Sequence, residues 1–285
     1  MASCVIRSRD VPFYIAQPTA PETPLVVEVP HAGLFIDPLA LATITAPARS
    51  VGMDADLYVD ELFAAAPRLG ATLLVSRVSR YVCDLNRSEA DVDCGAVENA
   101  PLAPFPHGLV WRLTTEGYPA VAMPIKAGEF ERRLNEIYRP YHAALLGLLK
   151  QKRDRFGYAI LLCAHSMPST GRVGHIDSGS VRASIVPGSR GRTTAAARVV
   201  DLPDELARKR GWSVAHDVPY RGGFATVHYG HPAHNVHAIQ VEINRQLYMR
   251  EDTLSRAPGG FHATQAYCEE LVSALGAISR EELVR

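Results

Sequence analysis

Two short apolar runs that each end beside a histidine constrain the fold most strongly. Residues 24–30 (Pro-Leu-Val-Val-Glu-Val-Pro) are rich in β-branched side chains and end on a proline directly before His31. Residues 158–163 (Tyr-Ala-Ile-Leu-Leu-Cys) form a similar run that ends directly before Ala164 and His165. Continuous apolar runs of this length are typical of buried strands. We therefore predict two buried strands with a histidine at the carboxyl end of each.

The rest of the chain alternates between helical and strand patterns. Apolar residues at helical spacing predict helices, and short apolar runs between turn-forming residues predict strands. The predicted helices span residues 53–69, 129–155, 195–209 and 264–274, and the further predicted strands span residues 71–76, 214–218 and 236–243, with a turn at 220–224. Residues 88–124 are rich in glycine, proline and acidic residues and predict a long irregular segment. Strands that alternate with helices predict an α/β fold, which we expect to form one domain over residues 1–285.

The composition excludes several classes of function. The chain has 30 basic and 30 acidic side chains and is 47% hydrophobic, so nothing favours a nucleic-acid or membrane partner. No apolar run approaches the ~20 residues of a membrane-spanning helix, and charges near the N-terminus argue against a signal peptide. The five cysteines form no CxxC pair, so we expect reduced thiols. These features predict a cytoplasmic protein.

His31 and His165 are the first candidates for a functional site. The carboxyl ends of parallel strands meet at one edge of a sheet, so the two histidines are expected to lie close together. A catalytic zinc site usually has three protein ligands, and a carboxylate often completes the set. Asp54 and Asp56 stand at the start of the predicted helix 53–69, where we expect Asp54 to cap the helix and Asp56 to bind the metal. A histidine at a strand end can also be a purely structural residue, so the spacing alone leaves both interpretations open.

Several segments match a known family in combination and in the same order. They are residues 29–33 (Val-Pro-His-Ala-Gly), 54–56 (Asp-Ala-Asp), 79–87 (Ser-Arg-Tyr-Val-Cys-Asp-Leu-Asn-Arg), 164–166 (Ala-His-Ser), 220–230 (Tyr-Arg-Gly-Gly-Phe-Ala-Thr-Val-His-Tyr-Gly) and 237–242 (His-Ala-Ile-Gln-Val-Glu). With these segments the chain resembles the N-formylglutamate amidohydrolases, also called N-formylglutamate deformylases of histidine degradation. The resemblance implies a three-layer α/β/α fold with a central mixed sheet, similar to the zinc carboxypeptidases. It also implies one divalent metal, with zinc expected, bound by His31, Asp56 and His165.

The same resemblance implies an amidohydrolase that uses water activated by the metal. Glu242 is the candidate for the general base, which takes a proton from water and passes it to the leaving amine. The alternative for Glu242 is a structural glutamate paired with Arg245. His228 is the candidate for stabilising the oxyanion or holding a substrate carboxylate.

The implied substrate, N-formyl-L-glutamate, is a small anion with two carboxylates. Guanidinium groups bind carboxylates through two parallel hydrogen bonds, so Arg80, Arg87 and Arg221 in the matched segments are the candidates for binding it. Arg87 stands near Asp84 in the sequence and has a structural alternative. Asn86 is a candidate for binding the substrate amide, with shaping of a turn as its alternative. The pair 222–223 (Gly-Gly) either lets the backbone approach a ligand or forms an ordinary tight turn.

Two features complicate this assignment. Cys163 occupies a position that is commonly acidic in the family, two residues before the second histidine, so that the exact acyl group and amino acid remain open. We expect a buried apolar filler there, with a soft group near the metal as the alternative. His231, His234 and His237 suggest a second metal site, which we disfavour because Pro232 breaks any helical spacing. The rival hypotheses are a metallohydrolase of another N-acyl amino acid or short peptide, and a non-catalytic binding protein. The sequence predicts no oligomeric state.

Overall fold

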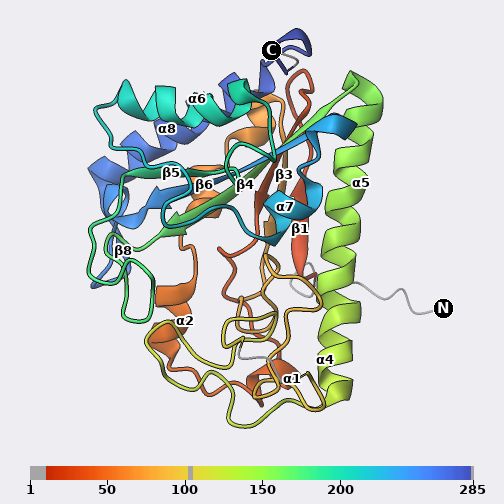
Figure 1. Cartoon of the computed structure of the whole chain (residues 1–285), viewed down its shortest axis with the longest axis vertical. Helices are drawn as coiled ribbons and strands as arrows, with labels where there is room; N and C mark the ends of the chain where they lie inside the picture. The colour runs from red at the N-terminus through yellow and green to blue at the C-terminus, as the bar shows by residue number, and fades with distance from the viewer. Residues whose placement is uncertain (1–10, 102–104, 284–285) are drawn as a thin grey trace, which may run out of the picture.

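The computed structural model describes residues 11–101 and 105–283 and contains a six-stranded mixed sheet (Figure 1). The strands lie in the order β1-β3-β2-β4-β6-β5. They span Phe13–Ala16 (β1), Leu25–Val29 (β2), Thr72–Ser76 (β3), Ala159–Met167 (β4), Ile185–Gly188 (β5) and Val236–Asn244 (β6). The four central strands are mutually parallel, whereas β1 and β5 run antiparallel at the two edges. The predicted α/β fold with a mixed sheet is therefore confirmed.

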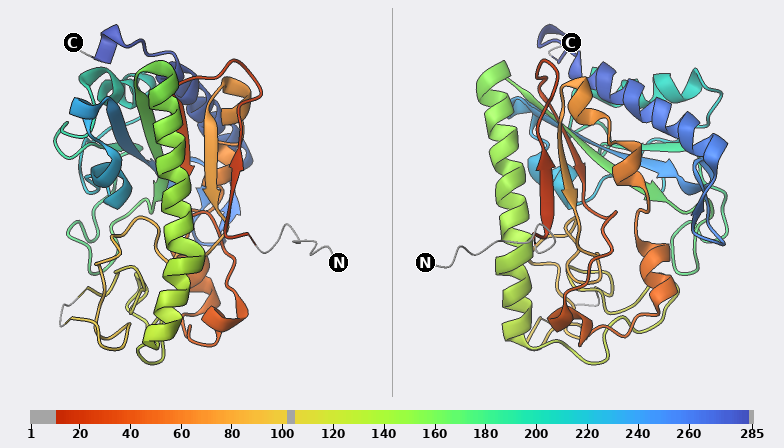
Figure 2. Two further views of the ribbon diagram at one scale, coloured as in Figure 1. Left: turned by 90° about the vertical axis from the view of Figure 1, so that its right-hand side faces the viewer. Right: turned by 180° about the vertical axis from the view of Figure 1, so that it is seen from behind.

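Helices cover both faces of this sheet (Figures 1 and 2). Helix α5 (Arg139–Phe156) packs against β2 and β4 on one face, and α6 (Ala197–Arg208) and α8 (Pro258–Gly276) cover the other. Successive side chains of a strand point to opposite faces, so Val26 packs in the cluster with α5 while Val27 packs in the cluster with α6 and α8. Burial on both faces explains why β2 and β4 are continuous apolar runs in the sequence.

Shorter elements connect these layers. They are the helices α1 (Pro38–Leu41), α2 (Ala48–Asp54), α3 (Val59–Leu62), α4 (Ala127–Arg133) and α7 (Phe224–Tyr229), the hairpin strands β7 (Met249–Arg250) and β8 (Ser255–Arg256), and 3₁₀ turns at Ala66–Leu69, Pro232–His234, Arg245–Leu247 and Glu281–Leu283. Within the described residues, no helix combines the length and apolar character needed to cross a membrane.

The helix predicted for residues 129–155 is confirmed as one continuous element. Helix α4, a π-helical turn at Leu134–Tyr138 and α5 follow one another without a break. The apolar stripe of this element buries Tyr141 and Leu145, and Gly157 ends it in the left-handed conformation. The predicted helices 195–209 and 264–274 correspond to α6 and to the central part of α8.

The helix predicted for residues 53–69 is wrong as a single element. The chain forms α2, α3 and a 3₁₀ turn at Ala66–Leu69 instead, because Ala55 is extended and Tyr58 has a left-handed φ of 68°. Asp54 therefore ends α2 and does not cap the start of a helix. The apolar residues Val59, Leu62, Phe63 and Ala66 nevertheless pack in one core cluster, which explains their spacing in the sequence.

Further differences concern the strands, and β1 has no counterpart among the predicted strands. The strand predicted at 214–218 reduces to one isolated bridge between Val214 and Ile185, because Asp217 has a left-handed φ of 59°. The strand β5 escaped prediction, since it contains Pro187 and Gly188, which usually mark turns. Proline is tolerated there because β5 is an edge strand.

The irregular segment predicted for residues 88–124 is confirmed in its described part. No helix or strand lies between β3 and α4 among the described residues, and Figure 1 shows this stretch gathered below the sheet. The strand β4 also continues through His165, so this histidine lies inside the strand near its carboxyl end. The carboxyl ends of the parallel strands and the irregular segment together surround the site.

Candidate metal centre and substrate cavity

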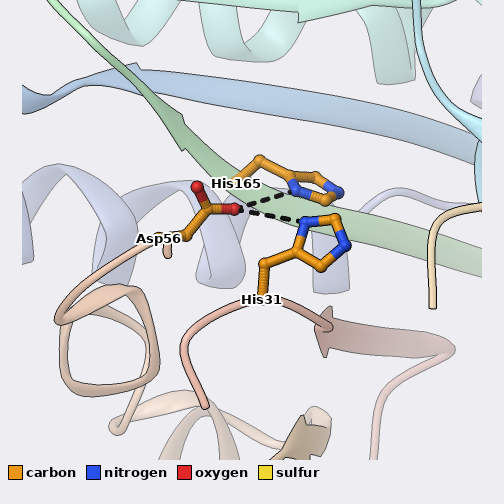
Figure 3. A group of neighbouring side chains, drawn as sticks. All are labelled: His31, Asp56 and His165. Carbon is orange, nitrogen blue, oxygen red and sulfur yellow. Dashed lines mark hydrogen bonds and ion pairs between the residues drawn. The ribbon is translucent and has the colours of Figure 1, made fainter. Parts of the chain in front are cut away.

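Three buried side chains from separate elements meet at the carboxyl end of the sheet (Figure 3). His31 follows β2, Asp56 follows α2 and His165 belongs to β4. The Oδ2 atom of Asp56 lies 3.6 Å from Nδ1 of His31 and 3.1 Å from Nδ1 of His165. The possible ligand atoms of the three residues all lie within 4.8 Å of one another. Among the described residues this is the only group of at least three His, Cys, Asp or Glu side chains with such spacing.

The hydrogen bonding of His31 leaves one ring nitrogen available. Nε2 of His31 lies 2.8 Å from Oδ1 of Asp84, so a proton on Nε2 is donated to this carboxylate. Nδ1 is buried and has no hydrogen-bond partner in the described part of the chain. An imidazole whose far nitrogen donates to a carboxylate is typical of metal-binding histidines. This Nδ1 points toward Oδ2 of Asp56 (Figure 3), so the residues present fit a bound cation.

Asp56 is fixed by contacts from three directions. Its backbone N–H donates to the carbonyl of His31 (3.0 Å), and its Oδ1 accepts from Nη2 of Arg245 (3.1 Å) and from Oγ of Ser166 (3.3 Å). Burial raises the pKa of Asp56, but the hydrogen bonds and charges of His165 and His31 outweigh it and hold the pKa well below its ordinary value. Asp56 is therefore a carboxylate aimed at the two histidines. Arg245 pairs with Asp56, so the alternative of a structural Glu242–Arg245 pair is not observed.

Asp84 is fully buried and contacts the ring of His31. It accepts hydrogen bonds from His31, from Nη2 of Arg80 (2.8 Å) and from Nε1 of Trp111 (3.0 Å). Burial raises the pKa of Asp84, but the charges of Arg80, His31 and Arg87 outweigh it and hold the pKa well below its ordinary value. We considered a structural pair of Arg87 with Asp84, but Arg80 forms the ion pair with Asp84 instead.

Glu242 lies beside His165 on the neighbouring strand. The two residues are in register between β4 and β6, and side chains in register on parallel strands point to the same face. Oε1 of Glu242 accepts a hydrogen bond from Nε2 of Gln240 (2.8 Å). Burial raises the pKa of Glu242, the charge of His165 opposes this shift, and the charge of Asp56 adds to it, so that the pKa lies above its ordinary value.

A cavity of about 400 Å³ opens over these residues. Its lining brings together the predicted residues His31, Asp56, Arg80, Asn86, Arg87, His165, Arg221 and Glu242. It also includes Arg172 and Arg190, which we did not predict, and Arg245, which we considered only as a partner of Glu242. Arg172 and Arg190 lie outside the matched segments, so only the folded chain brings them to the site.

The arginines of the cavity differ in their partners. Arg80, Arg172 and Arg245 form ion pairs with acidic residues of the protein. Arg87 instead donates to the backbone carbonyls of His107 (2.7 Å) and Asn86 (3.1 Å), and it forms no ion pair with a described residue. The remaining two, Arg190 and Arg221, also have no acidic partner in the described chain. Positive charge that the protein does not neutralise suits an anionic ligand.

Asp54 has a structural role different from the predicted helix cap. Its carboxylate accepts hydrogen bonds from the hydroxyls of Tyr81 and Thr115 and from Arg172. Burial raises the pKa of Asp54, but the bonds from Thr115 and Tyr81 outweigh it and lower the pKa overall. The bond from Thr115 thereby connects the irregular segment to Asp54 at the cavity lining.

Asn86 and Gly223 pack against each other. Oδ1 of Asn86 accepts from the backbone N–H of Ala225 (3.0 Å), and Nδ2 lies 3.3 Å from Nε2 of His165. A Cβ atom at Gly223 would lie 2.2 Å from Nδ2 of Asn86. Glycine at this position therefore lets the backbone approach Asn86.

The structure does not bring His228 to the cavity, which corrects its predicted role. His228 is exposed on α7, where its ring stacks on Phe224 at 4.7 Å between centroids, and it lines a separate surface hollow with His231 and His234. His237 is buried, and its Nδ1 accepts from the backbone N–H of Ala196 (3.1 Å). The short spacing of these histidines in the sequence thus reflects a turn, and no metal cluster forms from them in the described structure.

Cys163 is a buried residue of the cluster under α5, as we expected. It is in register with Glu28 on β2, whose Oε1 accepts a hydrogen bond from the Tyr141 hydroxyl (3.1 Å). Burial and the neighbouring Glu28 raise the pKa of the Cys163 thiol well above its ordinary value, and Cys163 is not part of the group formed by His31, Asp56 and His165. An acidic group is nonetheless present at this level of the sheet, supplied by β2 in place of β4.

Comparison with known proteins agrees with this site. The family model described as N-formylglutamate amidohydrolase matches residues 23–249. The chain belongs to the N-formylglutamate amidohydrolase family. The N-formylglutamate deformylase of Pseudomonas putida is 31% identical over 265 residues, covering 92% of this chain and 96% of the relative. That of Pseudomonas aeruginosa is 32% identical over 265 residues, covering 90% and 94%.

Solved structures extend the comparison to the fold. The N-formylglutamate amidohydrolase from Ralstonia eutropha JMP134 matches with a TM-score of 0.85 and 33% identity, over 95% of this chain and 99% of that chain. A gene product of Agrobacterium tumefaciens matches with a TM-score of 0.67 and 20% identity, over 93% of this chain and 95% of that chain, which shows a shared fold. The expected membership in a family of amide-cleaving hydrolases is confirmed.

Proposed function

We propose that this member of the N-formylglutamate amidohydrolase family hydrolyses the amide of a small N-acyl acidic amino acid. The substrate proposed first is N-formyl-L-glutamate, which would yield formate and L-glutamate. One observation carries the proposal: His31, Asp56, His165 and Glu242 face one cavity. That cavity also contains arginines without acidic partners, which suits a dicarboxylate.

The proposed cofactor is one divalent cation, most simply Zn²⁺. Nδ1 of His31, Nδ1 of His165 and a carboxylate oxygen of Asp56 would hold it, because these atoms lie close together and nitrogen with oxygen ligands suits zinc. When bound, such an ion lowers the pKa of water and polarises the scissile carbonyl. Asp84 fixes the His31 ring, and Arg245 fixes the Asp56 carboxylate, so each of these two ligands has a supporting contact.

Glu242 is proposed as the general base and acid. Its carboxylate would accept a proton from the attacking water as the new carbon–oxygen bond forms at the formyl carbon. It would then deliver this proton to the nitrogen as the carbon–nitrogen bond breaks, which releases the amine of glutamate. The buried environment that raises the pKa of Glu242 makes it a better proton acceptor than an exposed glutamate.

Arg87 is proposed to bind the α-carboxylate of the substrate. It lies next to Asn86, whose side chain contacts His165, so it is close to where the scissile amide would sit. Its guanidinium is oriented by two backbone carbonyls and keeps further N–H groups available. Arg80 faces the cavity but is already paired with Asp84, and its part in substrate binding would be electrostatic.

Two coarser expectations complete the proposal. We propose that residues 1–285 form one metallohydrolase domain, whose layers would resemble those of the zinc carboxypeptidases. The rival substrates are other N-acyl amino acids and short peptides. The positive charge of the cavity favours them less than it favours a dicarboxylate.

A metal-loaded assay over a panel of amides tests the proposal. The panel contains N-formyl, N-acetyl and peptide derivatives of glutamate and aspartate, with amine release as the readout. We expect the highest kcat/KM for N-formyl-L-glutamate. Faster turnover of a peptide or an N-acetyl derivative would favour a rival substrate, and no turnover of any compound by metal-loaded protein would favour a binding protein.

A further inference from the structure

Two exposed arginines on the cavity lining, Arg190 and Arg221, have no acidic partner among the described residues. The side chain of Arg190 makes one hydrogen bond, from Nε to the carbonyl of Gly222 (3.0 Å), and the side chain of Arg221 makes none with a described residue. Both guanidinium groups therefore present N–H donors that the protein does not use.

The loop that carries Arg190 is built around a carboxylate. The backbone N–H groups of Ser189, Arg190 and Gly191 all donate to Asp217, at 2.7, 3.1 and 2.7 Å. Arg190 itself has a left-handed φ of 53°, which costs energy for a residue with a side chain. Three hydrogen bonds to one carboxylate offset this cost. Asp217 therefore determines where the Arg190 side chain leaves the backbone.

The segments that carry the two arginines lie directly against each other. The backbone N–H of Arg190 donates to the carbonyl of Arg221 (3.0 Å). A Cβ atom at Gly188 would lie 2.6 Å from the backbone nitrogen of Gly222, so glycine permits this contact. The end of β5 and the loop before α7 thus form one side of the cavity, and both arginines belong to it.

We propose that Arg190 and Arg221 bind the side-chain carboxylate of the substrate and that Asp217 is the positioning residue for Arg190. The inference rests on the proposed function. The α-carboxylate is attached next to the scissile amide and must stay near His165 and Arg87. The second carboxylate is separated from the α-carbon by two methylene groups and extends toward the rim. Two guanidinium groups there would select acidic over neutral side chains.

Steady-state kinetics with matched substrates test the arginine pair. The substrates are N-formyl-L-glutamate and N-formyl-L-glutamine, which differ in the charge of the side chain. We expect R190Q and R221Q each to raise KM for formylglutamate about tenfold, because a charge-assisted hydrogen bond is lost. We expect kcat and the kinetics with formylglutamine to stay within about twofold. An equal loss on both substrates, or no change on either, would contradict the inference.

R192Q is the matched control for the arginine change. Arg192 is in the same loop and also has a left-handed φ, but it pairs with Asp201 and does not line the cavity. We expect R192Q to keep the wild-type preference for formylglutamate. D217A should raise KM for formylglutamate without changing formylglutamine kinetics, whereas D201A should change neither. A D217A protein that keeps wild-type KM would remove the positioning role of Asp217.

Binding without turnover separates this inference from the proposed reaction. Calorimetry with glutarate, a dicarboxylate, and with butyrate, a monocarboxylate of similar length, measures the carboxylate site directly on metal-loaded protein. Wild-type protein should bind glutarate more tightly, and R190Q should lose about tenfold of that preference. Equal binding of both acids by wild-type protein would overturn the inference. A clear preference for glutarate in a protein that cleaves no formyl amino acid would support the inference and refute the proposed function.

Discussion

The protein contains two groups of histidines that differ in burial, in their contacts and in their separation along the sequence. His31 and His165 are far apart in the sequence but meet in the buried centre, with ring centroids 5.0 Å apart. His228, His231 and His234 are close in the sequence but are exposed around α7 and the turn that follows it. The first group has a carboxylate between its members, whereas the second contacts aromatic rings and backbone carbonyls.

This difference shows that the sheet topology assembles the site, whereas close spacing of histidines along the chain does not. Parallel strands β2 and β4 are neighbours, so residues near their carboxyl ends are brought together wherever they stand in the chain. The surface histidines lie on short helical turns, where the ring centroids of His231 and His234 are 6.1 Å apart, but they form no group of metal ligands with an acidic residue in the described structure.

The largest expected effect comes from exchanging one histidine of each group for alanine. H165A should lose bound metal and reduce kcat/KM about a thousandfold or more, because a ligand is missing. H234A should leave both unchanged. Metal analysis and kinetics on the two purified variants check this, and a similar effect of both substitutions would refute the contrast.

A large effect is also expected for E242Q. Glutamine keeps the shape of Glu242 but cannot accept the proton, so we expect kcat to fall about 10²–10⁴-fold. Metal content should stay at the wild-type value, because Glu242 is not a member of the ligand group. Turnover close to wild type would exclude Glu242 as the base, and loss of metal would show that it acts on the ion.

A smaller effect is expected from the residue behind His31. D84N removes the charge that receives the His31 Nε2 proton, so metal affinity should fall about 10–100-fold. D93N is the matched control, because Asp93 is a similarly buried acid that pairs with Arg112 and does not line the cavity. Chelator competition measures both affinities. Equal affinities in the two variants would mean that Asp84 has no role in holding the ligand.

The smallest effect concerns pH. Burial raises the pKa of Glu242, and its base function requires the carboxylate, so activity should be lost as the pH falls through this raised pKa. The acid limb of kcat/KM should therefore lie above the ordinary glutamate value of about 4.3. A pH profile of the wild type and of E242D measures the limb. A limb at the same pH in both proteins would assign it to another group.

The strand and helix pattern predicted most of the sheet because β2 and β4 are largely apolar runs buried on both faces and β6 is rich in β-branched residues. Prediction failed where a single backbone conformation decided the structure, as at Tyr58 and Asp217. It also failed for β5, whose Pro187 is compatible with a strand only at a sheet edge. A local pattern does not reveal which strand will be an edge.

For the site, the strand-end histidines were visible in the sequence, but the choice of Asp56 and Glu242 came with the matched family segments. His228 was wrongly placed at the site because its segment also contains residues that do line the cavity. Arg190 could not be found, and Arg245 was paired with the wrong carboxylate, since the place of each depends on contacts with residues distant in the chain. Only the fold reveals which arginines already have an acidic partner.

The most direct test of the central claim is to measure metal and activity together on one preparation. The account predicts about one divalent ion per chain in the purified protein, as expected for three ligands at one site. Removing the ion with a chelator should abolish hydrolysis of N-formyl-L-glutamate, and adding Zn²⁺ should restore it. A metal-free preparation with full activity would contradict the account.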